Sequence, residues 1–209
     1  MQIERIRPVE NASDKNRIIT VTGISGAGKD YLVKKASELE PELLGGKIAI
    51  FNFGSELLAS IRQSLADADS ITQDALKDMQ LDDLDAYIQR TLDRLIGFQP
   101  SLQMTHVVFK QRGSYVMNPQ SELRTKALEY LFIESDPDQI SQWRIENQDK
   151  RKREIELMDD INLHQTIARL GTYAMATRLG AGMVIVKNDP SFTDSIACEM
   201  VQECRDLLL

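Results

Sequence analysis

The chain has 209 residues, of which 42% are hydrophobic and 27% charged, as expected for a soluble globular protein. Its formal net charge of −7 argues against a nucleic-acid-binding surface, which usually carries an excess of basic residues. No apolar run approaches the length of a membrane span, and the first residues do not resemble a secretory signal. We therefore expect a cytoplasmic protein that binds neither nucleic acid nor a membrane.

Residues 1–16 are polar and show no helical or strand periodicity. We expect them to form an N-terminal arm, which could be disordered, ahead of a single domain at residues 17–209. From residue 17 onward, strand-like and helix-like segments alternate, which predicts a doubly wound α/β fold with a parallel sheet. Five strands are expected, at residues 17–22, 47–53, about 102–109, 128–134 and 183–186.

Helical periodicity is clearest over residues 81–96 and 159–179, where apolar residues recur at a spacing of three or four. A C-terminal helix presents an apolar face from Ile196 to Leu208, with Ser191 as its expected N-cap. In open sheets of this kind, ligands bind beyond the carboxyl ends of the strands. The segments that follow each strand are therefore the places to look for a functional site.

The most informative motif runs from Gly23 to Asp30 and has the spacing G-x-x-x-x-G-K, with Asp30 where Ser or Thr is usual. It lies between a β-branched segment and a helix-like one, which is the context of a phosphate-binding P-loop. The glycines let successive N–H groups point inward, while the helix N-terminus and the Lys29 ammonium add positive charge. The residues expected to bind a nucleotide are Gly23, Ser25, Gly26, Ala27, Gly28, Lys29, Asp30 and Tyr31.

Polar and basic residues follow the next three strands and would form a cationic cleft in an acidic protein. The candidate substrate-binding residues are Asn52, Gly54, Ser55, His106, Lys110 and Arg112. Arg144, Arg151 and Arg153 lie in a basic segment that follows the fourth strand. With Lys29 these arginines are the candidate catalytic residues, because phosphoryl transfer needs neutralisation of charge rather than a covalent nucleophile.

Simpler interpretations of these residues stay open. The basic residues 150–153 could form a solvated helix face, and His106 could be an ordinary polar residue at a strand end. His164 lies on a predicted helix without a partner motif, so we interpret it as a structural residue.

The order of these motifs resembles the archaeal-type adenylate kinases, a branch of the P-loop nucleoside monophosphate kinases. The matching pieces are V-T-G-x-x-G-x-G at 21–28, N-F-G at 52–54, T-H-x-V at 105–108, Gly113-Ser114-Tyr115 and Asp136-Pro137. The three arginines also resemble the arginine-bearing lid of this family, so the resemblance implies a short helical lid at about 138–158. The resemblance implies ATP and Mg²⁺ as cofactors, a nucleoside monophosphate such as AMP as acceptor, and a cytoplasmic homo-oligomer, a trimer in that family.

Several positions depart from the family pattern. Met104 stands where the family usually has Asp, while Lys77 and Lys110 stand where arginines for the acceptor phosphate are expected. Asp30 replaces the P-loop Ser or Thr that contacts Mg²⁺. Because Met104 cannot orient a metal, we expect Asp30 to bind Mg²⁺ directly or through water.

Three functions are compatible with this sequence. The first is transfer of the ATP γ-phosphate to a nucleoside monophosphate, most simply AMP. A second is a P-loop kinase of another small acceptor, such as a sugar phosphate. The third is a nucleotide-binding regulator without catalysis, which Met104 and the altered acceptor side would favour.

Overall fold

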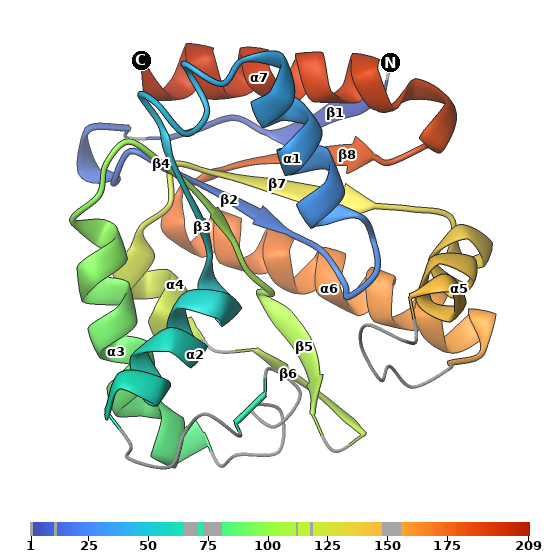
Figure 1. The fold of residues 1–209 in the computed structure, drawn as a ribbon, viewed down its shortest axis with the longest axis horizontal. Helices are drawn as coiled ribbons and strands as arrows, with labels where there is room; N and C mark the ends of the chain where they lie inside the picture. Colours follow the sequence, from blue (N-terminus) through green and yellow to red (C-terminus); the bar gives the residue numbers. More distant parts are fainter. Residues whose placement is uncertain are drawn as a thin grey trace.

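The computed structural model describes residues 2–10, 12–64, 71–72, 81–111, 113–117, 119–147 and 156–209. These residues form an α/β fold around one six-stranded sheet (Figure 1). Its strands are β1 (Ile3–Arg7), β2 (Ile18–Thr22), β3 (Ala49–Asn52), β4 (Ser101–Met104), β7 (Glu129–Glu134) and β8 (Gly182–Lys187), in the spatial order β1-β8-β7-β2-β4-β3. The expected doubly wound class is confirmed.

The sheet has one strand more than predicted. Five strands are parallel, whereas β1 pairs antiparallel with β8, with Ile3 opposite Val186 and Arg5 opposite Val184. The prediction of five strands is therefore wrong, and residues 3–7 of the expected arm are an ordered edge strand. Only Ile3 of this strand is buried, so the segment has no apolar alternation that could reveal it in the sequence.

The third predicted strand, 102–109, is wrong in its second half. β4 ends at Met104, and β5 (Val108–Gln111) leaves the sheet to pair antiparallel with β6 (Ser114–Met117). Where the chain turns, the backbone N–H of Val107 donates to Thr22 Oγ1 at 3.1 Å. The β5–β6 hairpin projects beyond the sheet, and it carries Lys110 with it (Figure 1).

Helices cover both faces of the sheet (Figure 1). α1 (Lys29–Leu39) packs beside α7 (Thr193–Leu208) on one face. The other face carries α3 (Leu81–Ile96), α4 (Pro119–Thr125) and α6 (Met158–Leu179), while α2 (Phe53–Ser64) and α5 (Pro137–Glu146) lie near the carboxyl edge. Within the ranges given above, no helix combines the length and apolar character needed to cross a bilayer.

The helices predicted over 81–96, over 159–179 and at the C-terminus are confirmed. The predicted Ser191 cap is wrong, because Ser191 lies in a short 3₁₀ turn, Pro190–Phe192. Asp189 caps that turn by accepting a hydrogen bond from the Ser191 N–H at 2.9 Å. The N-cap of α7 itself is Phe192, whose side chain makes no capping bond.

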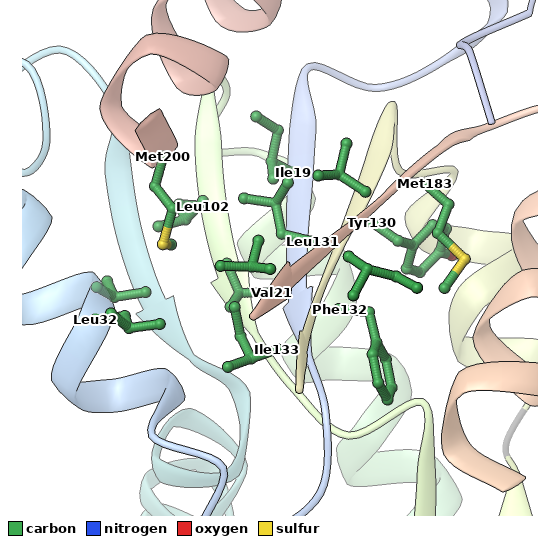
Figure 2. Close-up of a cluster of buried hydrophobic side chains, with 14 of the residues drawn as sticks. Ile19, Val21, Leu32, Leu102, Tyr130, Leu131, Phe132, Ile133, Met183 and Met200 are labelled. Atoms are coloured by element: carbon green, nitrogen blue, oxygen red, sulfur yellow. The ribbon is translucent and has the colours of Figure 1, made fainter. Parts of the chain in front are cut away.

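The core consists of side chains that alternate between the two faces of the central strands. Figure 2 shows Ile19, Val21, Leu131 and Ile133 on the side of Leu32 and Met200, whereas Tyr130, Phe132 and Met183 lie on the other side. All five residues of β2 are buried. A strand packed on both faces holds the loop at its carboxyl end in a defined place.

Candidate active site

The predicted P-loop leaves the carboxyl end of β2 and enters α1. Gly23 and Gly28 have φ angles of 138° and 86°. A Cβ at Gly23 would lie 2.4 Å from the Ile133 carbonyl oxygen, and one at Gly28 would lie 2.2 Å from Asn188 Nδ2. Both the backbone conformation and the close neighbours therefore require glycine at these two positions.

Residues that directly follow β7 and β8 anchor the loop. The carbonyl oxygen of Ala27 accepts hydrogen bonds from Ser135 Oγ and Asn188 Nδ2, each at 2.9 Å. Gln165 of α6 holds Ser135 through both backbone groups, accepting from its N–H at 3.1 Å and donating to its carbonyl at 2.8 Å. Our sequence analysis missed these three anchors, although Ser135 and Asn188 directly follow strands at the edge where ligands bind.

Lys29 is the first residue of α1, and its side chain is almost fully buried against the loop. Its Nζ donates to the carbonyl oxygens of Gly23 and Ile24, both at 3.0 Å. His106, at the end of the neighbouring strand, also bonds to Gly23, with Nδ1 2.8 Å from the same carbonyl oxygen. The structure therefore places Lys29 and His106 together at the loop.

Arg144 lies on α5, whose start is capped by Asp136 accepting from the Asp138 N–H at 2.8 Å. The Arg144 guanidinium is buried and donates to the Ser25 carbonyl oxygen through Nε at 3.2 Å and Nη2 at 2.8 Å. Arg144 and Ser25 are 119 residues apart in the sequence, and their contact brings a second cation to the P-loop.

Glu156 links this arginine to the acceptor side. Arg144 Nη1 donates to one of its carboxylate oxygens at 2.5 Å, and Lys110 Nζ donates to the other at 2.6 Å. Burial by itself would raise the pKa of Glu156, but the hydrogen bonds and charges of Lys110 and Arg144 hold it below its ordinary value. Our sequence analysis missed Glu156, because one glutamate in a densely charged segment carries no distinguishing pattern.

Asn52 connects the end of β3 with Asp30. Its Nδ2 donates to Asp30 Oδ1 at 3.1 Å, and its Oδ1 accepts from the Ser55 N–H at 3.2 Å. Gly54 lies in the first turn of α2, not in an extended loop. The predicted residues Lys77, Arg112, Arg151 and Arg153, and most of the proposed lid beyond residue 147, lie outside the described residues.

The surroundings of Asp30 fit a limited role in metal binding. The carboxylate is exposed in the first turn of α1, and Met104, whose side chain packs against the core, offers no oxygen ligand. Over the described part of the chain, no three His, Cys, Asp or Glu side chains gather as a metal cage. Mg²⁺ commonly binds one or two carboxylates together with substrate phosphates and water, so Asp30 could supply such a ligand.

Comparison with known proteins agrees with the resemblance seen in the sequence. Adenylate kinase from Methanococcus aeolicus is 27% identical over 201 residues, which cover 91% of this chain and 99% of that protein. Adenylate kinase from Methanococcus vannielii is 26% identical over 205 residues, covering 91% and 100%. No family model matches the chain.

A solved structure of similar fold is a shikimate kinase from Acinetobacter baumannii in complex with shikimate. Its TM-score is 0.53, with 10% sequence identity over 90% of this chain and 93% of that one. At this identity the likeness concerns the fold alone. The P-loop and the adenylate kinase relatives together support a P-loop kinase. Among such kinases the chain is similar to the archaeal adenylate kinases, as its motifs predicted.

Proposed function

We propose that this protein transfers the γ-phosphate of ATP to a nucleoside monophosphate, with AMP as the acceptor. The main support is the convergence of Lys29 and Arg144 on the carbonyl oxygens of one P-loop, in a chain of net charge −7. Two buried cations at a loop of this kind suit a ligand with several negative charges. The relatives named adenylate kinase favour a nucleotide as that ligand.

The donor would bind along the P-loop and the first turn of α1. The backbone N–H groups of residues 23–28 and the helix N-terminus would hold its phosphates, and Ser25, Gly26, Ala27, Asp30 and Tyr31 would line it. Lys29 would exchange its carbonyl partners for the β- and γ-phosphates. Arg144, with Arg151 and Arg153 of the proposed lid, would stabilise charge on the transferring group.

The acceptor would bind opposite the donor, so that its phosphate lies in line with the γ-phosphate. Asn52, Gly54, Ser55 and His106 would line this side, and Lys110 and Arg112 would bind the acceptor phosphate. Asn52 and His106 each bond to a P-loop residue, which supports a cleft shared by the two substrates.

Further elements of the proposal come from the family resemblance and from Asp30. Bound Mg²⁺ would neutralise charge on the β- and γ-phosphates, and Asp30 would hold it. We also propose that the enzyme acts in the cytoplasm and forms a homo-oligomer, a trimer according to the family resemblance.

Product detection with ATP plus AMP, the other nucleoside monophosphates and ribose phosphates tests the proposal. We expect AMP-dependent formation of ADP that is lost in the Lys110→Ala/Arg112→Ala variant. A sugar phosphate preferred over every nucleotide would contradict the AMP assignment. Tight ATP binding without phosphorylation of any acceptor would instead support the regulator, the alternative that Met104 favours.

A further inference from the structure

Glu156 lies between cations from the two sides of the proposed cleft. Lys110 comes from the β5–β6 hairpin, on the acceptor side, while Arg144 is bound to the P-loop carbonyl of Ser25, on the donor side. The exposed fractions of the Glu156 and Arg144 side chains are 8% and 6%. This carboxylate is therefore a buried bridge between donor and acceptor elements, not a surface ion pair.

The position of Glu156 is one that a phosphate group would suit. A phosphoryl group in transit has to be contacted from the donor side and the acceptor side at once. Like a phosphate, the Glu156 carboxylate accepts one charge-assisted hydrogen bond from an ammonium and one from a guanidinium, at 2.6 Å and 2.5 Å. The two cations cannot give the same hydrogen bonds to Glu156 and to a substrate phosphate.

A buried imidazole next to these residues has no hydrogen-bond partner among the residues that the structure describes. His164 of α6 is 5% exposed, and neither of its ring nitrogens has a hydrogen-bond partner within the described part of the chain. Its ring centroid lies 5.0 Å from that of Tyr115, which pairs with Lys110 in the hairpin. Unpaired buried polar groups are unfavourable, so this arrangement suits a site that receives a further polar group.

The charge state of His164 agrees with that interpretation. Burial lowers its pKa to about 4, and although the Glu156 charge opposes this shift, the charges of Arg144, Lys110 and Lys29 reinforce it. The ring is neutral at neutral pH, and one of its nitrogens carries a proton that can be donated to an anion.

We propose that Glu156 is an internal anion that occupies the place of a substrate phosphate between Lys110 and Arg144, and that phosphate-bearing ligands displace it. The inference rests on the proposed function for the identity of those ligands, and it adds an intramolecular competitor to the site. A carboxylate on the same chain competes at a high effective concentration. It would therefore select ligands whose several phosphates also engage the P-loop over inorganic phosphate alone.

The test is calorimetric titration of the full chain with inorganic tripolyphosphate and, separately, with ATP. Glu156→Gln removes the charge and leaves an amide that cannot accept through both of its terminal atoms. We expect its dissociation constant for tripolyphosphate to fall at least about fivefold, because the competitor is weakened. In steady-state kinetics, the KM of this variant for ATP should fall by a larger factor than its kcat changes.

Asp159→Asn is the matched control. Asp159 is exposed in the first turn of α6, three residues from Glu156, and the substitution changes the net charge by the same amount. A general electrostatic effect would strengthen binding equally in both variants. Equal gains in the two variants would overturn the proposal.

Glu156→Asp keeps the charge but shortens the side chain, so it should bridge both cations poorly and also bind tripolyphosphate more tightly than wild type. Unchanged or weaker binding in every folded Glu156 variant would show that the carboxylate is only structural, and would overturn the inference. Lys29→Ala in the same titration separates the two proposals. If it binds like wild type, the P-loop assignment fails, whatever Glu156 does.

Discussion

Lys29 is the residue on which donor binding depends most directly. Its buried ammonium is held by two P-loop carbonyls, so Lys29→Ala should cost only about 1 kcal/mol of stability. We expect the affinity for ATP, measured by calorimetry, to fall by at least about 100-fold, because the substitution removes the charge that the P-loop holds for the β- and γ-phosphates. Lys47→Ala, at an exposed lysine, is the control and should bind normally. Wild-type affinity in Lys29→Ala would contradict the prediction.

Asp30 should act through a metal, since a carboxylate beside phosphates is otherwise repulsive. Asp30→Ala should weaken ATP binding roughly tenfold in the presence of Mg²⁺ but leave metal-free binding unchanged or slightly tighter. Titrations with and without EDTA measure the difference. Asn52→Ala removes the hydrogen bond at 3.1 Å to this carboxylate but leaves the carboxylate itself, so its effect should be smaller. Equal losses with and without Mg²⁺ in Asp30→Ala would exclude Asp30 as the metal ligand.

Glu122 should make the stability depend on pH. It is buried on α4, accepts a hydrogen bond from the Tyr130 hydroxyl at 2.7 Å, and burial raises its pKa from 4.5 to about 7. Between these two pKa values, 4.5 and about 7, the folded state keeps a proton that the unfolded state has lost. The free energy of unfolding therefore falls as the pH rises through this range. The contribution is on the order of 3 kcal/mol.

Glu122→Gln keeps an acceptor for Tyr130 and abolishes the titration. Urea unfolding should show the variant close to wild type at about pH 5 and clearly more stable at about pH 8. Glu146→Gln, at an exposed position on α5, is the charge-matched control. A difference from wild type that is the same at both pH values would contradict the raised pKa.

At the scale of elements, the position of the β5–β6 hairpin depends on Gly171 in α6. A Cβ at this glycine would lie 2.6 Å from Val108 Cγ2 and 3.7 Å from Met117 Sδ. The missing side chain lets both strands of the hairpin approach the helix. The hairpin in turn carries Lys110, so this contact contributes to positioning the proposed acceptor side.

Gly171→Ala should lower the melting temperature, although alanine favours a helix by about 1 kcal/mol over glycine. It should also raise KM for the acceptor, because the hairpin is pushed from α6. Val108→Ala in the same chain should restore part of both losses, and a double-mutant cycle measures this coupling. Additive effects of the two substitutions would show that the contact between Gly171 and Val108 does not determine the position of the hairpin. Asn162→Ala, at an exposed site on α6, is the helix control.

At the scale of the whole molecule, Arg5 joins three elements that are distant in the sequence. Its guanidinium bonds to Glu129 of β7, whose side chain is fully buried, and to Glu203 of α7 at 2.5 Å. Burial raises the pKa of Glu129 to about 7 even though the charge of Arg5 opposes this shift. Strand β1 therefore contributes a cation that pairs with a buried carboxylate, as well as an edge to the sheet.

Arg5→Ala should destabilise the fold by about 2 kcal/mol at pH 8, where Glu129 would be left buried and unpaired. The loss should shrink at about pH 5.5, because Glu129 is then protonated in the folded state. Chemical denaturation at the two pH values measures the change. Adding Glu129→Gln should remove the pH dependence. If Arg5→Ala instead costs the same stability at both pH values, the loss comes from the packing of Arg5 and not from the charge of Glu129.

The elements that the sequence predicted correctly are those with strong local signals. The P-loop turn has fixed spacing, β2, β7 and β8 are short apolar runs, and α3, α6 and α7 repeat at helical periods. The errors concern elements that need distant partners. β1 requires the edge of β8, and the hairpin requires the surface of α6 at Gly171. Neither partner can be identified from the few residues that surround the element in the sequence.

The same division applies to the candidate site. The sequence by itself determined the turn of the P-loop and the similarity to P-loop kinases, because glycines and Lys29 at fixed offsets act through the backbone they belong to. Only the tertiary structure decided what surrounds that loop: Ser135 and Asn188 behind Ala27, Arg144 against Ser25, and Glu156 between two cations. The Asn188–Ala27 pair is separated by 161 residues. Such contacts depend on the order of the strands and on side-chain reach across the sheet edge, which no local pattern encodes.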